Sequence, residues 1–122
     1  MDKIEFIAKI RYFGWICFQI SADQPYNIIP TKDQFDSLKQ GVQFALENPD
    51  MTSEENHHNW MKMKLSQGWK YGKVKDLEKK IHPDLVPFDD LPEIEKKKDL
   101  MDRLMNKLAE ELWNDISNKT EE

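Results

Sequence analysis

The stretch "HHNWMKMKLSQGWKYGKVKD", residues 57–76, differs most in composition from the rest of the chain. It holds two tryptophans, one tyrosine and a run of lysines, although the 122-residue chain has a net charge of -5. Residues 57–82 contain seven lysines and two acidic residues, a net charge of +5, so the rest of the chain carries -10. An acidic body disfavours binding of nucleic acid polymers or of anionic membranes over the whole surface. A local positive region within it suits a small anion.

Helical spacing sorts the aromatic and basic residues of this stretch. His57, Trp60 and Lys64 are spaced i, i+3, i+7, which places them on one face of a helix. An indole can stack on a purine, an ammonium group can meet a phosphate, and an imidazole can donate or accept a hydrogen bond. This face therefore suits a nucleotide-like ligand. Three further candidates for the same site follow in an irregular segment: Trp69, Tyr71 and Lys75.

A second interpretation of the tryptophans stays open. Tryptophans at helical spacing are more often core residues than ligand platforms, since most of a large apolar side chain is normally buried. Trp60 would then pack under its helix, and Trp69 would fill the space beyond the helix end. The lysines would form a solvated face.

The surrounding sequence predicts a mainly α fold of about four helices, with short extended or β segments between residues 69 and 90. Thr31 is a predicted N-cap, Thr52 with Glu55 forms a capping box, and Gly68 is placed to end a helix. The expected helices cover residues 3–20, 32–47 and 53–67, and a long one begins at Pro92. A small β-hairpin is expected between residues 69 and 90. We expect one domain over residues 1–122, with its core within 3–116 and a frayed tail at 117–122.

Apolar periodicity predicts which helix faces turn inward. In the first helix the expected apolar face is Phe6, Ile10, Phe13, Cys17 and Ile20, so Cys17 is expected to be a buried small hydrophobe. In the second helix the predicted buried residues are Phe35, Leu38, Val42 and Leu46. The last helix carries a stripe of Leu100, Leu104, Leu108, Leu112 and Ile116.

Cysteine content and hydropathy indicate a cytoplasmic protein. A lone cysteine excludes an intrachain disulfide, which is typical of reducing compartments. No apolar run approaches the ~18 residues that a membrane span needs, and no targeting segment is expected.

The sequence contains no convincing catalytic or metal-binding constellation. His57 and His58 are adjacent, so on a helix they point about 100° apart and share a metal poorly. Two carboxylate pairs, Glu54–Glu55 and Asp89–Asp90, sit at or just before helix starts, where acids are favoured in any case. We therefore expect no catalytic residue, no metal and no cofactor. An enzyme acting on a nucleotide is the least favoured hypothesis.

A family resemblance emerges from the order of short motifs across the middle of the chain. His57 and Trp60 give H-x-x-W, and five motifs follow: "GWKYG" at 68–72, "VKD" at 74–76, "HP" at 82–83, "LVPF" at 85–88 and "LPEIEK" at 91–96. In this order and spacing the chain resembles the RyR domain, a module named from ryanodine receptors. Residues 41–60 resemble the single-copy forms of bacterial and phage proteins. The resemblance covers roughly residues 8–113.

The resemblance implies a small helical fold without catalysis that serves as a sensor or binding module, often in nucleotide signalling and defence. It marks Trp60, Lys64 and His82 as ligand-binding positions, whereas Trp69 and Tyr71 belong to the motif but can be architectural. The chain departs from the family pattern at Lys73, Asp84 and Phe88. The first helix departs as well, so that Arg11, Tyr12 and Trp15 become candidates for ligand contact.

Two functions of different kinds follow. The first is binding of a small anionic, nucleotide-derived ligand, to sense or to sequester an immune or second-messenger signal. A phage anti-defence sponge in the host cytoplasm would be one example. The alternative is a protein-interaction or scaffold module that uses exposed aromatics and the C-terminal helix, which also offers a surface for a homodimer.

Overall fold

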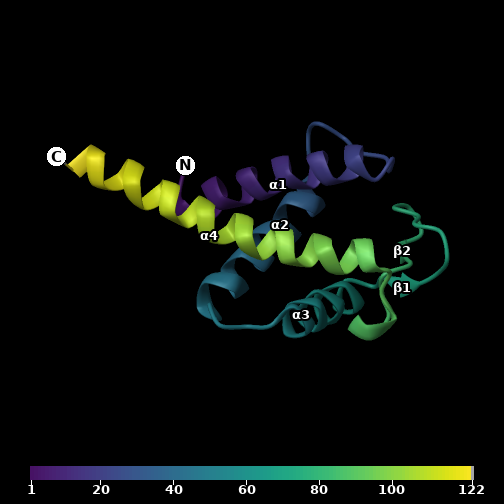
Figure 1. The fold of residues 1–122 in the computed structure, drawn as a ribbon. Helices are drawn as coiled ribbons and strands as arrows, with labels where there is room; N and C mark the ends of the chain where they lie inside the picture. Colours follow the sequence, from purple (N-terminus) through teal and green to yellow (C-terminus); the bar gives the residue numbers. More distant parts are fainter. Residues whose placement is uncertain (122) are drawn as a thin grey trace. The chain divides into compact units, whose positions relative to one another are not determined.

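The computed structural model describes residues 1–121, and the chain divides into two compact units. The first comprises Met1–Pro49 with the segment from Leu100 onward, and the second comprises Asp50–Asp99. The fold is mainly helical, as predicted (Figure 1). The helices are α1 (Lys3–Ser21), α2 (Lys32–Glu47), α3 (Ser53–Ser66) and α4 (Glu93–Glu121); the short elements are β1 (Lys70–Tyr71), β2 (Ile81–His82) and the 3-10 turn η1 (Phe88–Asp90). A single domain over the whole chain stays a prediction.

The core of the first unit lies between α1, α2 and the C-terminal part of α4. Its fully buried residues are Ile7, Ala8, Val42 and Ala109. Six partly buried residues pack against them: Ile4, Phe6, Ile10, Phe35, Leu38 and Leu46. The predicted inner face of the second helix is thus confirmed, and Thr31 begins that helix with a complete capping box.

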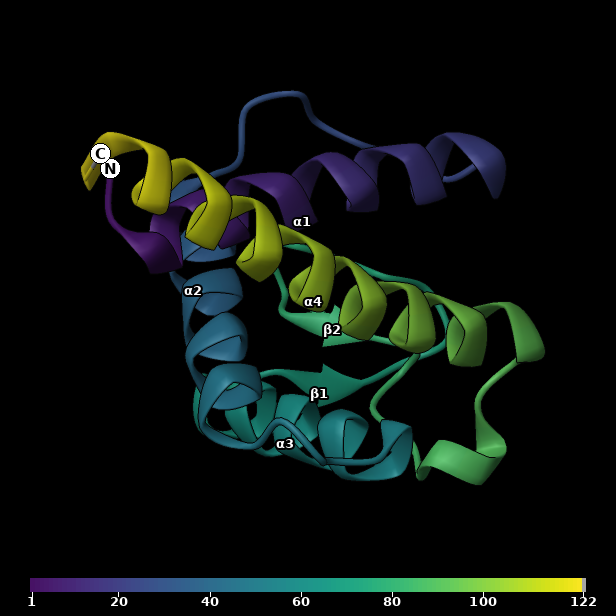
Figure 2. The ribbon, with the colours of Figure 1, turned by 60° about the vertical axis from the view of Figure 1, so that its left-hand side comes forward.

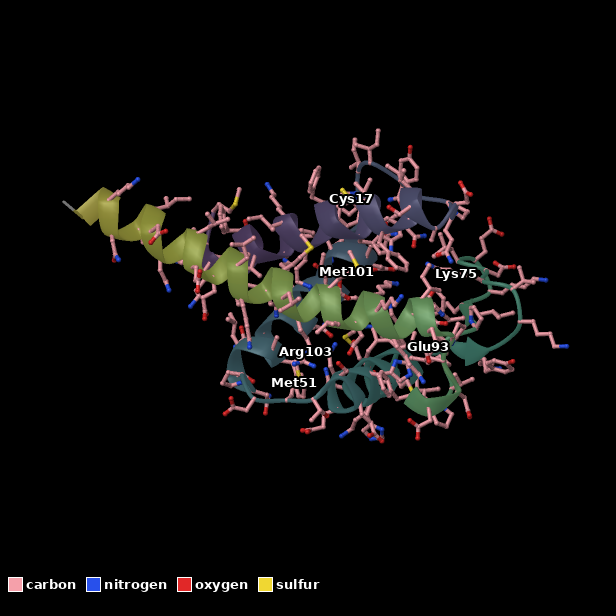
Figure 3. The ribbon with its side chains drawn as sticks, viewed as in Figure 1. Cys17, Met51, Lys75, Glu93, Met101 and Arg103 are labelled. Carbon is pink, nitrogen blue, oxygen red and sulfur yellow. The ribbon has the colours of Figure 1, made fainter. Side chains whose placement is uncertain are left out.

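The predicted inner face of the first helix is right only in its first two residues, because Phe6 and Ile10 pack against the core and the other three do not. Phe13 is 66% exposed and Ile20 is 54% exposed, and the thiol-bearing Cys17 is exposed as well (Figure 3). The buried face of α1 is instead formed by Ile7, Ala8, Tyr12, Gly14, Phe18 and Gln19. Apolar residues occur all around this helix, so periodicity alone left its rotation undetermined. The small residues at positions 8 and 14 decide it, because they allow close approach of neighbouring elements.

Helix α4 packs along α1 within the first unit. A Cβ atom at Gly14 would clash with the Met105 sulfur, so the two helices approach closely there. The other contacts are the ion pairs Lys3–Glu110 (2.9 Å) and Arg11–Asp102 (3.4 Å), and the ring pair Phe6–Trp113 (5.5 Å between centroids). Residues 117–121, predicted to be frayed, continue the helix, and Glu122 lies outside the described residues.

In the second unit, α3 begins and ends at the predicted signals. Thr52 and Glu55 form the expected capping box. Gly68 adopts φ +91°, the left-handed conformation that favours glycine. The Gly68 N–H donates to the Leu65 carbonyl (3.1 Å) and the Trp69 N–H donates to the Lys64 carbonyl (3.0 Å). This is a Schellman motif, and it turns the chain so that Trp69 lies back beside the last turn of α3.

The predicted β-hairpin is wrong, because β1 and β2 pair in parallel (Figure 2). Lys70 pairs with Ile81, and Tyr71 pairs with His82. The chain reverses twice between the strands, and an antiparallel bridge joins Asp76 to Ile81. The Asp76 carboxylate accepts hydrogen bonds from the backbone N–H groups of residues 78 and 79, which holds this turn. No helix within residues 1–121 is long and apolar enough to cross a membrane.

Candidate ligand-binding site

Four rings form an aromatic cluster in the second unit: His57, Trp60, Trp69 and His82. His57 stacks on Trp60 with 5.5 Å between ring centroids and 25° between planes. His82 meets the Trp60 ring edge-on at 4.9 Å and the Trp69 ring at a tilted 6.0 Å. All four are among the residues predicted to bind ligand, and the structure brings their rings together; their contact with a ligand stays a prediction. Both tryptophans are half-buried, intermediate between core residues and open platforms.

Lys64 adds a positive charge to one side of the aromatic cluster. Its Nζ lies 5.1 Å from the centroid of the Trp69 ring, within the range of a cation–π interaction. The Schellman motif at Gly68 creates this contact, since it returns Trp69 to the turn that carries Lys64.

His82 is the buried, neutral centre of the aromatic cluster. The Asp84 backbone N–H donates to His82 Nδ1 (3.1 Å), so Nδ1 is unprotonated and the neutral ring carries its proton on Nε2. Burial lowers the pKa of His82 to about 3, assisted by nearby positive charges. Those charges belong to Lys75, Lys98, Lys64 and His57. The ring is therefore a hydrogen-bond donor within a positive field.

His57 holds the cluster in place from the α3 side. Its Nε2 lies 2.8 Å from the Val86 carbonyl, to which it can only donate. The ring also lies 6.1 Å from that of Phe88. His57 is buried, and it ties α3 to the extended segment before η1. The motif histidine thus has an architectural role, whatever else it contacts.

Two lysines and two carboxyl groups form a charged group near His82. Burial raises the pKa of Asp84 to about 6, and the charge of Glu95 and a hydrogen bond with it act in the same direction. The Lys75 residue is exposed overall, but desolvation of its ammonium group by neighbouring atoms lowers its pKa, as does repulsion by Lys98, whereas Asp84 and Glu95 act in the opposite direction. Lys98 and Glu95 form an ion pair at 3.9 Å. Lys75 lies in the loop between the strands (Figure 3).

The remaining predicted residues fall in two places. Tyr71 is 57% exposed on β1, directly paired with His82 in the sheet. Arg11, Tyr12 and Trp15 belong to the first unit, where they have their own contacts. Arg11 pairs with Asp102, the Tyr12 hydroxyl donates to the Asn27 carbonyl, and the Tyr12 and Trp15 rings stack at 5.3 Å.

Sequence reasoning missed three charged residues near His82: Asp84, Glu95 and Lys98. Asp84 was visible only as a departure from the family pattern, and its carboxyl group faces Glu95. Glu95 lies in the first turn of α4, where an acid is favoured in any case, and Lys98 is one of several lysines that follow it, so neither residue by itself indicated a site. The excess of lysines in the motif region was the available signal, but it did not indicate which of them would lie near His82.

The chemistry available at this site is ring stacking, hydrogen-bond donation and charge pairing. Within residues 1–121, no group of three or more His, Cys, Asp or Glu side chains is arranged to hold a metal ion. The donors and cations present instead favour an anion with an aromatic portion.

Comparison with protein-family models places this site in a known module. The model of the RyR domain matches residues 42–110, more than half of the chain. The matched range contains α3, both strands, η1 and every residue of the aromatic cluster. The chain belongs to the RyR domain family.

Proposed function

We propose that this RyR domain is a non-catalytic module that binds a small anionic, nucleotide-derived ligand at the aromatic cluster. The observation that carries the proposal is the position of His82, a neutral buried donor between two tryptophans and within the field of three lysines. An anion in this position would reduce the repulsion among the lysines, and it would accept a hydrogen bond from a ring that does not need to ionise.

The rings of the site would contact a base in different ways. His57 already covers one side of Trp60, so that indole contributes chiefly by its edge and by holding His82. Trp69 and the exposed Tyr71 provide the surfaces on which a base would stack. Lys64, which is already beside Trp69, would meet a phosphate attached to that base.

Affinity distinguishes a sensor from a sponge. A sequestering protein, such as a phage anti-defence factor, needs nanomolar binding, which corresponds to about -12 kcal/mol. A stacked base and a few charge contacts supply less, unless a closing loop or a second copy encloses the ligand. Micromolar binding would favour sensing.

A thermal-shift screen followed by calorimetry tests the proposal. The ligands are nucleotides, cyclic oligonucleotides and ADP-ribose derivatives. A ligand at 100 times its dissociation constant stabilises the fold by about 2.7 kcal/mol. Lys64→Met keeps the aliphatic stem but removes the charge, and it should weaken binding about tenfold or more. Lys62→Met, on the exposed side of the same helix, is the matched control. No shift with any ligand, or equal loss in both variants, would refute the proposal.

An interaction module is the alternative function. The apolar stripe on α4 favours it, because its five side chains are 40–57% exposed. Recovery of a stoichiometric protein partner, together with no response to any nucleotide, would favour this alternative.

A further inference from the structure

The loop that connects β1 and β2, residues 72–80, presents apolar side chains at the surface of the second unit (Figure 1). Val74 is 78% exposed and Leu77 is 59% exposed, so no other part of residues 50–99 covers them. The loop is closed at its base, because Lys70 pairs with Ile81. Aliphatic side chains in this position gain free energy when they leave water for an apolar phase.

Lysines without ion-pair partners lie beside these two side chains. Lys70, Lys73 and Lys79 are exposed, and within residues 1–121 none of the three has a carboxylate within ion-pair distance. The Asp76 carboxylate accepts hydrogen bonds from two backbone N–H groups of the loop, which leaves Glu78 as the exposed acid. The surface of the loop is therefore both apolar and basic.

Backbone contacts hold the loop in a fixed shape. An antiparallel bridge joins Asp76 to Ile81, and the Lys80 ammonium group donates to the Gln67 carbonyl (2.9 Å) at the end of α3. Residues 74 and 77 are three positions apart, so their Cα atoms lie within about 11 Å of each other. The apolar side chains and the lysines thus occupy one small region, and a partner would not have to order it first.

An anionic lipid surface suits this combination better than a protein or a nucleic acid. Lysine is depleted in protein interfaces, and valine and leucine seldom dominate their binding energy. Single-stranded nucleic acids stack on aromatic rings, so exposed aliphatic side chains add little to their binding. A membrane interface takes up aliphatic side chains, and its anionic headgroups attract lysines.

The net charge of the whole chain does not oppose this contact at the loop. Residues 70–80 hold five lysines and two acids, a net charge of +3, although the chain carries -5. Salt screens exposed charges beyond about 10 Å at 0.1 M, so acids farther than that from the headgroups contribute little. The contact would be at the membrane surface, since residues 1–121 contain no helix that could span a bilayer.

We propose that the loop at residues 72–80 docks on membrane surfaces that contain anionic lipids. Val74 and Leu77 enter the interface, and the ammonium groups of Lys70, Lys73 and Lys79 meet the headgroups. None of these five residues belongs to the predicted ligand site, so the proposal is independent of nucleotide binding. Two aliphatic side chains and a few lysines give weak, reversible binding.

Co-sedimentation of the full chain with lipid vesicles tests the proposal. The wild type should bind phosphatidylcholine vesicles that contain phosphatidylserine, bind less as salt is added, and not bind phosphatidylcholine alone. The double variant Val74→Ser, Leu77→Ser should weaken binding at least tenfold, and Lys73→Gln should weaken it about fivefold. The matched controls are Ile29→Ser, at a position 82% exposed in the first unit, and Lys9→Gln on α1. Both should bind as the wild type does.

A fluorescent label reports whether the loop itself enters the interface. An environment-sensitive dye is attached to Leu77→Cys in a Cys17→Ser background, which removes the natural thiol. Its emission should shift to the blue with phosphatidylserine vesicles, whereas the same dye on Ile29→Cys should not respond. A wild type that binds neither vesicle, or binds both equally, would overturn the proposal. So would equal losses in the loop variants and their controls, or a dye at position 77 that does not respond.

Discussion

Lys64 and Trp69 are joined twice, because the Lys64 carbonyl accepts a hydrogen bond from the Trp69 N–H (3.0 Å) and Lys64 Nζ lies 5.1 Å from the indole centroid. The backbone hydrogen bond fixes the position of the Trp69 main chain, and the Lys64 ammonium group lies against the indole ring of the same residue. Both contacts depend on one left-handed residue, Gly68. The end of a helix is therefore what shapes the basic side of the aromatic cluster.

Gly68→Ala should destabilise the protein by about 1 kcal/mol, because alanine at φ +91° is strained even though nothing crowds its Cβ. Displacement of Trp69 should change the tryptophan fluorescence of the native state. Chemical denaturation and emission spectra measure both effects. A variant with wild-type stability and emission would contradict this role for the glycine.

Gly14→Ala and Gly41→Ala are the same substitution in two helices with opposite expected signs. At Gly41 the nearest atom to a new Cβ is Arg11 Nη1 at 3.7 Å, so alanine should stabilise the protein by about 0.5–1 kcal/mol. At Gly14 the new Cβ would displace Met105, and overpacking should offset that gain and cost about 1–2 kcal/mol net. Adding Met105→Ala should remove part of the penalty of Gly14→Ala. Denaturant titration compares the set, and equal effects of the two glycine changes would refute the close approach of α1 and α4.

The pH dependence of stability should contain two opposing terms. The folded pKa of His82 is lowered from 6.5 to about 3, so its contribution is complete above pH 6.5 and is lost as the pH falls toward 3. The folded pKa of Asp84 is raised from 3.8 to about 6, so its contribution is complete below pH 3.8 and is lost as the pH rises through 6. Between pH 4 and 6 the two largely cancel.

Asp84→Asn should remove the opposing contribution, so that the contribution of His82 to the pH dependence of stability can be measured. The free energy of unfolding should then fall, between pH 6 and 4, by up to about 1 kcal/mol per pH unit more steeply than in the wild type. His82→Gln should reverse that slope. Thermal unfolding across this pH range measures both, and parallel curves for the wild type and Asp84→Asn would show that the carboxyl group is not perturbed.

Arg11→Met should reduce stability by about 1–3 kcal/mol, because the Arg11 side chain is only 12% exposed and its loss leaves Asp102 without this ion-pair partner. The double variant Arg11→Met, Asp102→Leu should recover much of the loss. A double-mutant cycle in denaturant provides the coupling. If Arg11 also contacts the ligand, the double variant should bind it more weakly than the wild type although its stability has recovered. Calorimetry measures that affinity.

Cys17 should react with a thiol reagent in the native protein at a rate close to that of the denatured chain, because its side chain is exposed. Phe18→Ala, one position along but in the buried face, should instead destabilise the fold by about 3 kcal/mol or more. Protection of the thiol in the native state would indicate that α1 is rotated toward the face that periodicity predicted.

Short-range sequence signals predicted most of the secondary structure correctly. Capping boxes at Thr31 and Thr52, and the glycine at position 68, are short-range chemistry, so the sequence located the corresponding helix ends to within about one residue. The rotation of α1 and the parallel pairing of β1 with β2 depend on partners distant in the chain. Periodicity does not report such partners, so the predicted face of α1 was right only at Phe6 and Ile10, and the predicted hairpin was wrong.

The candidate site divides in the same way. Helical spacing brought His57, Trp60 and Lys64 together, and motif order added Trp69 and His82. Nothing local indicated that Lys98, about sixteen residues beyond His82, acts on the same imidazole. Its charge matters only after the chain has folded back, and a lysine on a helix surface is ordinary in sequence.

Because the pKa of Asp84 is raised, binding of an anion beside this carboxyl group should be accompanied by proton uptake. With a pKa of about 6, this carboxyl group is largely ionised at pH 7 and would repel the anion. An arriving negative charge raises that pKa further and draws a proton from the buffer. The heat of binding should then vary with the ionisation enthalpy of the buffer, and the slope gives the number of protons absorbed. Affinity should decline as the solution becomes more alkaline.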